Sequence, residues 1–442
     1  MGFAAIILAA GKGSRMNSSR PKVMHQLAGA PLIDHVLHNA EEAGAERLIV
    51  VVGYGSEEVE HHLDGRAETV MQATQNGTGD ATLHAKEKLA DFQGDAVVLY
   101  GDGPFVYPET IAAALEKRAS GADLVIVGFD APDPTGYGRL IMDGDTLEAI
   151  VEEKDCNDDQ KAVTLCNLGV VSAPAPLLFE LLAEVGNNNA NGEIYLTDIV
   201  AIAWRKGLNC GVVLCDPSEA AGVNSRVQLA EAEASFQARA RTEAMENGTT
   251  LVAPETVFFA LDTYVGADVL IEPNVVFGPG VTVENGAHIK AFCHLEGCHI
   301  SEASVVGPFA RLRPGAEVGA FGKVGNFVEI KNAVIGKGAK VNHLSYVGDA
   351  EIGAESNIGA GVIFCNYDGV FKHHSTLGER VFVGSNSALV SPVYIGDDAL
   401  IGTGSVVTKD VPAGDLVLAR AEQINKKGRG KRLMDMLKAK KK

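Results

Sequence analysis

The sequence lacks the patterns that mark several common classes of protein. Its seven cysteines include no C-x-x-C pair and no Cys/His cluster at zinc spacing, which argues for reduced thiols in a cytosol and against structural zinc. No apolar run approaches the length that spans a membrane. A signal peptide carries a positive residue before its apolar stretch, and the apolar stretch 3–10 has none before it. We therefore expect a cytoplasmic chain with no membrane partner.

Positive charge is also scarce. The formal net charge of the 442 residues is −19, which does not indicate a general nucleic-acid binder, and the length predicts two or three domains. The exception is the tail 426–442, where nine Lys or Arg residues accompany one Asp. A solvated, disordered end is the simpler interpretation. The alternative is that the tail holds the phosphates of a bound cofactor.

A six-residue repeat dominates the second half of the chain. Between Val265 and Pro412 an aliphatic residue followed by Gly or a small residue recurs about every sixth position, as in Val318-Gly319, Val324-Gly325, Ile352-Gly353 and Ile395-Gly396. This period predicts a parallel β-helix of roughly eight turns stacked at about 4.8 Å. A Gly-rich β-sandwich is disfavoured, because sandwich strands alternate with period two.

The predicted rod resembles the left-handed β-helix of the hexapeptide acyltransferases. Members of that family are usually trimers with active sites between neighbouring subunits. The left hand opposes the usual right-handed crossover, so the resemblance alone implies it. The resemblance likewise implies a homotrimer formed through the β-helix.

The first half of the chain has an α/β pattern. Apolar runs at 3–9, 48–52, 96–100 and 124–128 alternate with helical stretches at 33–43, 78–89 and 108–119, which predicts a mostly parallel, Rossmann-like sheet. The first run opens into the loop 10–16, whose glycines match neither the dinucleotide fingerprint nor the P-loop. On spacing alone, a plain strand-to-helix turn remains an alternative to a ligand-binding loop.

The full string L-A-A-G-K-G-S-R-M, followed by Pro21-Lys22, resembles the signature of sugar-nucleotide pyrophosphorylases. The resemblance implies a reaction between UTP and a sugar 1-phosphate. Its catalytic candidates are Arg15 and Lys22, because cations must offset the repulsion of two anions. Asp102 and Asn224 match the metal ligands. One carboxylate and one amide suit a Mg²⁺ that arrives with the substrate.

The same resemblance implies contacts to a UDP-N-acetylglucosamine product. Gln72 with Gly77 and Thr78 would contact uracil, and Gly138, Glu152 and Asn167 would hold the N-acetylated sugar, although Leu168 stands where Thr is usual. The complete set implied for this ligand is Leu8, Ala9, Ala10, Gly11, Lys22, Gln72, Gly77, Thr78, Tyr100, Gly101, Asp102, Gly138, Glu152, Asn167 and Asn224.

A second set of polar residues interrupts the repeat. Arg313 and Lys331 are one predicted turn apart and should stack on one side of the rod, where a phosphate would fit. His343 lies in K-V-N-H-L-S-Y, which resembles the segment carrying the catalytic base of glucosamine-1-phosphate acetyltransferases. A neutral imidazole suits that task near pH 7. The period breaks between Phe364 and Thr376, an irregular loop of the kind that often carries a site.

The resemblance also implies the substrates of this second site. Glucosamine 1-phosphate would contact Arg313, Lys331, Tyr346 and Asn357. The acetyl donor, acetyl-CoA, would contact Ala360, Asn366, Tyr367, Ser385, Thr403 and Arg420, although Thr403 stands where Ala is common.

Together these motifs cover the chain from Leu8 to Arg420 and resemble a bifunctional family that makes a bacterial cell-envelope precursor. That family joins a glucosamine-1-phosphate N-acetyltransferase to an N-acetylglucosamine-1-phosphate uridyltransferase. We expect a uridyltransferase domain at 1–224, a helical linker at 225–248 and an acetyltransferase β-helix with its basic tail at 249–442. A pyrophosphorylase with a merely oligomerising rod and a non-catalytic regulatory subunit are the alternatives; His343 argues against the first, and Arg15 with Asp102 against the second.

Overall fold

The computed structural model describes residues 2–187, 189 and 192–441. They form two compact units, Met1–Gln237 and Ala238–Lys442. The expected domains 1–224 and 249–442 also include Met1, Asn188, Ala190, Asn191 and Lys442, which lie outside the described residues. The boundary between the units falls inside α8 (Arg226–Glu246), which lies within the helical linker that the sequence predicts at 225–248.

The first unit is built on a mostly parallel sheet whose central path runs β11-β7-β10-β6-β1-β4-β5. β1 is parallel to both β4 and β6, whereas β10 is antiparallel to β6 and β7. Two further strands, β8 and β9, pair at the side of this path. The strands are β1 Phe3–Ala9, β4 Ala45–Val52, β5 Glu68–Met71, β6 Asp95–Tyr100, β7 Leu124–Asp130, β8 Arg139–Asp143, β9 Thr146–Val151, β10 Leu165–Pro174 and β11 Cys210–Leu214, with β2 Gln26–Leu27 and β3 Ala30–Pro31 forming a separate pair.

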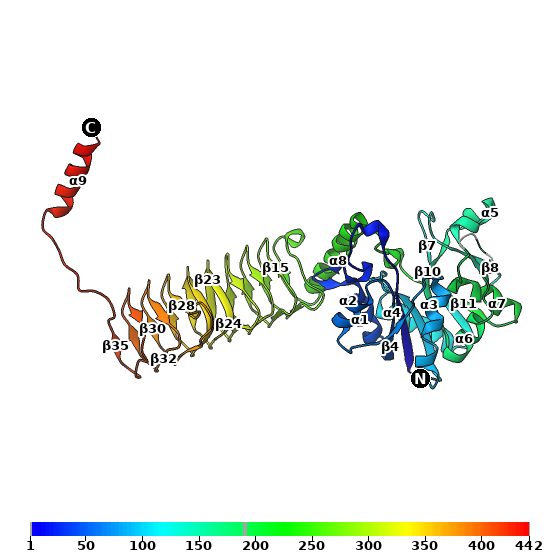
Figure 1. Ribbon diagram of the computed structural model, residues 1–442, viewed down its shortest axis with the longest axis horizontal. Helices are drawn as coiled ribbons and strands as arrows, with labels where there is room; N and C mark the ends of the chain where they lie inside the picture. Colours follow the sequence, from blue (N-terminus) through cyan, green and yellow to red (C-terminus); the bar gives the residue numbers. More distant parts are fainter. Residues whose placement is uncertain (1, 188, 190–191, 442) are drawn as a thin grey trace. The chain divides into compact units, whose positions relative to one another are not determined.

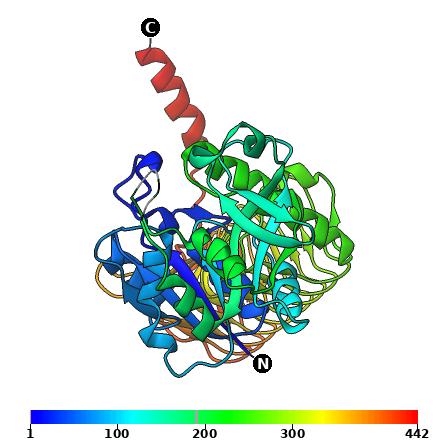
Figure 2. The ribbon, with the colours of Figure 1, turned by 90° about the vertical axis from the view of Figure 1, so that its right-hand side faces the viewer.

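Helices cover both faces of this sheet (Figure 2). Alternate residues of β1 point to opposite faces: Ala4 and Ile6 pack with residues of α3, α6 and α7, while Ala5 and Ile7 pack with residues of α1, α2 and α4. Strands buried on both faces explain the continuous apolar runs. The helices are α1 Leu32–Glu42, α2 Ser56–Leu63, α3 Thr78–His84, α4 Pro108–Ala119, α5 Asp158–Lys161, α6 Ala175–Leu182 and α7 Ile199–Arg205.

One predicted helix is shorter than expected. The stretch 78–89 forms α3 only to His84, after which the chain tightens and a separate 3₁₀ turn follows at Glu87–Leu89. Ala85 and Lys86 donate their backbone N–H groups three residues back, to Thr82 and Leu83. This bonding ends the regular α-helix.

The second unit is a parallel β-helix whose coils stack along one axis (Figure 1). One face is a ten-stranded sheet, in which each strand pairs with the strand one coil away. Its inward residues, such as Val324, Val341 and Ile358, are at most 2% exposed. The ten strands are β12 Thr250–Leu251, β14 Leu270–Ile271, β17 His288–Ile289, β20 Val305–Val306, β23 Lys323–Asn326, β25 Lys340–His343, β27 Asn357–Ile358, β30 Phe382–Val383, β33 Leu400–Ile401 and β35 Leu416–Val417.

The rod is longer than the repeat predicts. β12 pairs with β14 and so begins the coil before Val265, and β35 extends it past Pro412. The remaining strands are β13 Tyr264–Val265, β15 Val276–Phe277, β16 Thr282–Val283, β18 His294–Leu295, β19 Cys298–Ile300, β21 Arg311–Leu312, β22 Ala316–Val318, β24 Glu329–Ile335, β26 Tyr346–Ile352, β28 Ile363–Cys365, β29 Ser375–Leu377, β31 Ala388–Val390, β32 Tyr394–Ile395 and β34 Val406–Val407.

Two segments depart from the coil. The predicted excursion is present as a loop between β28 and β29, in which Tyr367 and Lys372 form an isolated bridge. The basic tail, for which the sequence allowed a disordered end, forms α9 at Arg429–Lys440 with its residues exposed. Among the described residues, no helix combines the length and apolarity needed to cross a bilayer.

Candidate functional sites

The first candidate site is a pocket of about 330 Å³ at the carboxyl ends of β1 and β6. This is the edge at which α/β sheets bind ligands. Ten residues of the implied nucleotide-sugar set line it: Leu8, Ala9, Ala10, Gly11, Lys22, Gln72, Gly77, Thr78, Tyr100 and Asp102. Val23, Gln75, Ala81 and Glu193, which the sequence did not single out as site residues, line it as well.

Glycines let the backbone close around this pocket. A side chain at Gly77, where φ is 114°, would come within 2.4 Å of the Ile194 carbonyl oxygen. The Gly79 N–H donates to that same carbonyl at 2.8 Å. Gly101 does not line the pocket, but its N–H donates to Leu8 at 3.0 Å and so ties the end of β6 to the end of β1.

Cations and potential metal ligands meet at one point beside the pocket. The Lys22 ammonium donates to the carboxylate of Asp102 and, at 3.0 Å, to Oδ1 of Asn224. Arg15 donates to the same Asn224 oxygen at 2.8 Å. The structure therefore brings together all four residues that the resemblance implies for catalysis and metal binding in this unit, although Arg15 and Asn224 lie outside the pocket lining.

The donor set fits a substrate-borne Mg²⁺. Asp102 and Asn224 already share one cation, the Lys22 ammonium, so their oxygens are close enough to share another. The described residues contain no group of three or more His, Cys, Asp or Glu side chains that could hold a metal alone. Phosphate oxygens and water would have to complete the octahedral sphere that Mg²⁺ requires.

The residues implied for the sugar form a second group. Asn167 N–H donates to the Gly138 carbonyl at 2.8 Å, and a side chain at Gly138 would lie 3.5 Å from the Glu152 carboxylate. Burial raises the pKa of Glu152, against a 3.2 Å hydrogen bond from Thr197 that favours the carboxylate. Gly138, Glu152 and Asn167 are thus brought together, but they do not line the pocket itself.

Gln72 and Gln75 support the pocket in different ways. Gln72 is buried, and its amide nitrogen donates to Asp80 at 2.7 Å and to the Gly77 carbonyl at 3.2 Å. Its amide is therefore held by the loop that opens α3. Gln75 donates to the Ala10 carbonyl at 2.7 Å and so anchors the start of the loop 10–16. A lone Gln before Asn-Gly carries no pattern by which the sequence could have revealed it.

The second candidate site lies along the ten-stranded face of the β-helix. Inward aliphatic residues of this face are register partners in successive coils. Two residues beyond each of five of them lie, in order, Asn326, His343, Ala360, Ser385 and Thr403. We call these five residues the site column. Backbone bonds follow it from coil to coil: the residue after His343 donates to Asn326, and the residue after Ala360 donates to His343. The implied base and three implied acetyl-CoA contacts therefore share one line.

Arg420 lies beside Thr403, the last residue of the site column along the chain. Its guanidinium donates to the Thr403 carbonyl at 2.6 Å. Tyr367, by contrast, lies on the excursion and is 59% exposed, with its hydroxyl donating to the Gly369 carbonyl at 2.6 Å. A cation at the end of the column suits the phosphates of an acyl carrier.

The other implied residues lie on neighbouring strands. Arg313 and Lys331 are one coil apart, as the 18-residue spacing predicts: Arg311 and Leu312 pair with Glu329 and Ile330. Arg313 donates to Glu329 at 2.9 Å, while Lys331 lies 4.0 Å from Asp349. Asn357 lies on β27, in register with Lys340.

A carboxylate organises this part of the site. Burial alone would raise the pKa of Asp349. Hydrogen bonds from Asn332 at 2.7 Å and Asn366 at 2.5 Å, together with the positive charge of Lys331, outweigh burial, so the pKa of Asp349 is lowered. Asn366 also donates to the Tyr346 hydroxyl at 3.4 Å. Asn366 thus lies with the implied sugar-phosphate residues rather than on the site column.

Lys372 is a further residue of this cluster that the sequence did not single out. The excursion folds it against Lys331, and the neighbouring ammonium lowers the pKa of Lys372. Two cations held together without an equal number of anions favour a bound anion. Because Lys372 reaches Lys331 only through the loop geometry, its spacing in the sequence gave no signal.

Comparison with known proteins decides the family. A model of the MobA-like NTP transferase domain matches residues 5–165, and the bacterial transferase hexapeptide model matches 262–297 and 374–409. Proteins named "Bifunctional protein GlmU" match along the whole chain. The one from Ruegeria sp. (strain TM1040) is 56% identical over 444 residues, covering 100% of this chain and 99% of its own. The one from Dinoroseobacter shibae is 54% identical, covering 100% of this chain and 99% of its own. The one from Cereibacter sphaeroides (strain ATCC 17025 / ATH 2.4.3) is 55% identical, covering 98% of this chain and 96% of its own.

The chain belongs to the GlmU family. Its fold is the expected one, a nucleotidyltransferase domain followed by a left-handed β-helix of hexapeptide repeats. It is a bifunctional transferase that acetylates glucosamine 1-phosphate and then joins the product to UTP, yielding UDP-N-acetylglucosamine and pyrophosphate. It uses acetyl-CoA and a substrate-associated metal.

Proposed function

We propose that the two candidate sites carry these two activities, with 1–224 serving as the uridyltransferase domain, 225–248 as a helical linker and 249–442 as the acetyltransferase domain. The observation that carries the proposal is the placement of the implied residues. Lys22 joins Asp102 and Asn224 beside one pocket, and His343 stands in line with Ala360, Ser385 and Thr403 in the other unit.

In the first unit, an oxygen of N-acetylglucosamine 1-phosphate attacks the α-phosphorus of UTP. An O–P bond forms, the bond to the β-phosphate breaks, and pyrophosphate leaves with the electron pair. Arg15 and Lys22 offset the negative charge that gathers on the reacting phosphates. Gly138, Glu152 and Asn167 hold the sugar, while Gln72, Gly77 and Thr78 hold uracil.

We assign the metal of this reaction as Mg²⁺, held by Asp102 and Asn224. When bound, Mg²⁺ supplies positive charge to the triphosphate oxygens and a fixed geometry. Lys22 must release Asp102 and Asn224 for this to occur, which frees its ammonium to turn toward the phosphates.

In the second unit, the amine of glucosamine 1-phosphate attacks the acetyl-CoA thioester. His343 takes a proton from the attacking nitrogen, the C–S bond breaks, and the thiol leaves with the electron pair and a proton. Arg313, Lys331, Tyr346, Asn357 and Lys372 hold the sugar phosphate. The acetyl donor runs along Ala360, Ser385 and Thr403 toward Arg420, with Asn366 and Tyr367 bordering it.

We further propose a cytoplasmic homotrimer assembled through the β-helix, with no nucleic-acid or membrane partner. His343 is exposed, and the neighbouring corner carries Phe309, Phe327 and Leu344, which are 45%, 55% and 60% exposed. An apolar stripe beside an open catalytic site supports burial by another copy of the chain. Hydrodynamic mass in solution tests this assembly, and a monomer that retains acetyl transfer would refute it.

The proposal is tested by supplying glucosamine 1-phosphate, acetyl-CoA, UTP and Mg²⁺ and following free thiol and pyrophosphate separately. We expect His343→Ala to abolish thiol release while pyrophosphate still forms from added N-acetylglucosamine 1-phosphate. We expect Asp102→Ala to do the reverse. Persistent thiol release in His343→Ala, or persistent pyrophosphate formation in Asp102→Ala, would remove that residue from its assigned role.

A further inference from the structure

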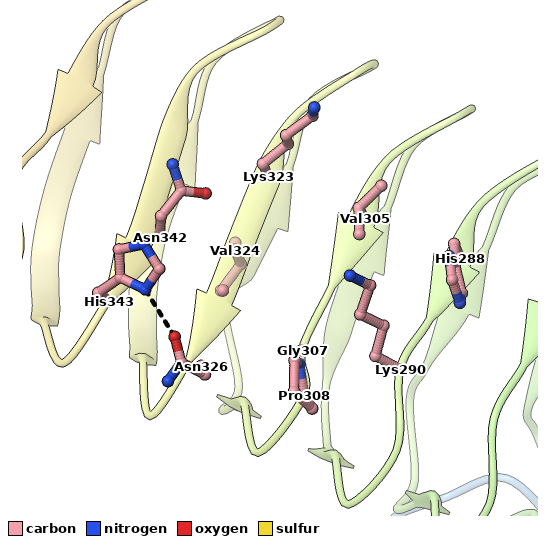
Figure 3. Close-up of a pocket in the computed structure, with 11 residues that line it drawn as sticks. His288, Lys290, Val305, Gly307, Pro308, Lys323, Val324, Asn326, Asn342 and His343 are labelled. Atoms are coloured by element: carbon pink, nitrogen blue, oxygen red, sulfur yellow. Dashed lines mark hydrogen bonds between the residues drawn. The ribbon is translucent and has the colours of Figure 1, made fainter.

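Asn326 and His343 are direct neighbours in the site column. They end the parallel strands β23 and β25 and are register partners. Oδ1 of Asn326 lies 2.7 Å from Nδ1 of His343, and Figure 3 shows the Asn326 oxygen turned toward the ring. This distance is that of a good hydrogen bond.

The contact determines where the ring carries its proton. An amide oxygen only accepts hydrogen bonds, so Nδ1 must be the donor. In the neutral imidazole the other nitrogen, Nε2, is then unprotonated and available as a base. We propose that Asn326 is a positioning residue for acetyl transfer, which holds the proton of His343 on Nδ1 and leaves Nε2 to accept the proton of the attacking amine.

Backbone packing holds the two strands at this distance. A side chain at Gly325 would come within 2.0 Å of the Asn342 carbonyl oxygen, so the chain beside Asn326 lies directly against β25. The Leu344 N–H donates to the Asn326 carbonyl at 3.0 Å, which clamps the two corners together. The hydrogen bond is therefore supported by the coil and does not depend on a mobile loop.

Among the described residues, no carboxylate lines the pocket that contains the His343 ring. The ionisable residues that line the pocket of about 370 Å³ shared with His343 are His288, Lys290 and Lys323. Lys340 lies on the same strand, and β27 on the other side carries Asn357 and Ile358, which do not titrate. Across the corner, Glu329 is paired with Arg313. A neutral amide thus fixes the tautomer without the charge that an aspartate would add.

This inference rests on the proposed role of His343 as the base, and kinetics separate the two. Asn326→Ala is expected to lower kcat for acetyl transfer about 10- to 100-fold, part of the roughly 10²–10⁴ that a positioned base contributes. KM for both substrates should stay within about threefold, because substrate binding is not the interaction lost. Asn342→Ala is the matched control: it lines the same pocket, makes no such contact, and should keep wild-type kcat.

Asn326→Asp distinguishes positioning from simple structural support. The carboxylate still accepts from Nδ1, so kcat should largely recover, but its charge favours the protonated ring. The acidic limb of the kcat profile should move to higher pH by about one unit. Nitrogen-15 spectra of the histidine-labelled full chain should show His343 protonated on Nδ1 in the wild type and a mixture of tautomers in Asn326→Ala.

Each outcome decides between the proposals. Pyrophosphate formation from added N-acetylglucosamine 1-phosphate and an unchanged circular dichroism spectrum verify that the variants are folded. Thiol release in His343→Ala would overturn both the role of His343 and this inference. An inactive His343→Ala together with wild-type kcat in Asn326→Ala, an unmoved profile in Asn326→Asp, or a wild-type spectrum protonated on Nε2 would overturn the role of Asn326 alone.

Discussion

The ammonium of Lys22 and the carboxylate of Asp102 form an ion pair at the carboxyl ends of β1 and β6. Both side chains are largely buried, at 15% and 20% exposed, so the pair is screened less than a surface pair. Lys22 occupies the position between Asp102 and Asn224 that we assign to the metal. In the proposed reaction, the ammonium and the metal that arrives with the substrate would therefore compete for the same oxygens.

Replacing Lys22 should separate metal binding from catalysis. In Lys22→Met we expect pyrophosphate formation to fall by about 10²–10³, as when an electrostatic donor is lost from an active site. Binding of Mn²⁺ to the substrate-free chain should tighten, because no ammonium competes for Asp102. Calorimetric titration measures the binding. Lys12→Met is the control, because Lys12 lies in the loop 10–16 with its ammonium over the Tyr54 ring at 5.5 Å. Weaker Mn²⁺ binding in Lys22→Met would contradict the assignment.

Glu152→Gln should keep or raise the melting temperature at alkaline pH while it weakens sugar binding. Burial raises the folded-state pKa of Glu152, so the folded state binds the proton more tightly than the unfolded state, and stability falls as pH rises through the raised pKa. The neutral amide removes that loss. At about pH 8 the variant should melt at an equal or higher temperature than the wild type, and the difference should vanish near the ordinary pKa of about 4.3.

The same variant should bind the sugar less well. KM for N-acetylglucosamine 1-phosphate should rise, because a charged acceptor is lost, while thiol release stays unchanged. Calorimetric scans across pH and the pyrophosphate assay measure both effects. A lower melting temperature at alkaline pH would contradict the cause assigned to the shift.

Arg420→Ala should weaken binding of the acetyl donor and leave binding of the sugar phosphate unchanged. The guanidinium lies against Thr403 at the end of the site column. In the proposed site, a charge-assisted contact from it to a donor phosphate would contribute about tenfold in affinity. We expect KM for acetyl-CoA to rise by about that factor, more at low salt, with KM for glucosamine 1-phosphate unchanged. Arg380→Ala is the control, since Arg380 is paired with Asp398 at 2.8 Å. Equal effects of the two variants would refute the assignment.

Gly325→Ala should disturb the coil that carries the proposed acetyltransferase site. The added methyl group would meet the Asn342 carbonyl at 2.0 Å, and such overpacking costs about 1–3 kcal/mol. We expect the β-helix to melt earlier and thiol release to fall, with pyrophosphate formation intact. Gly430→Ala, whose methyl group meets nothing within 4 Å, should change neither activity. An unaltered melting profile in Gly325→Ala would contradict the close approach of the strands.

Regular spacing is what the sequence conveyed best. Period six predicts the coils, and the 18 residues from Arg313 to Lys331 correspond to one coil. The same count fails nearby, because Asn326 and His343 are 17 residues apart and still pair directly. The corners at Phe327 and Leu344 have positive φ values of 56° and 52°. The six-residue repeat does not encode a coil of 17 residues, so spacing alone could not place Asn326 beside His343.

Loops and side-chain orientation were the parts the sequence could not supply. The excursion was predicted where the period breaks, but its return path, which places Lys372 against Lys331, depends on contacts between distant residues. The string at 8–16 indicated a ligand-binding loop through its resemblance to pyrophosphorylases, whereas the hydrogen bond from Gln75 that anchors this loop depends on an isolated residue. Local pattern located the segments, and tertiary packing selected the partners within them.

The even rise of the coils turns the site column into a scale of length. From β25, which ends at His343, the column climbs through β27 and β30 to β33, just before Thr403, whose carbonyl accepts from the Arg420 guanidinium; this is roughly 14 Å at about 4.8 Å per strand. In the proposed acetyltransferase site, a donor must span that distance to present its acyl carbon at the imidazole while an anionic end meets the guanidinium. The number of coils between His343 and Arg420 therefore sets the length of donor that can reach both residues. A shorter thioester would contact only one of them.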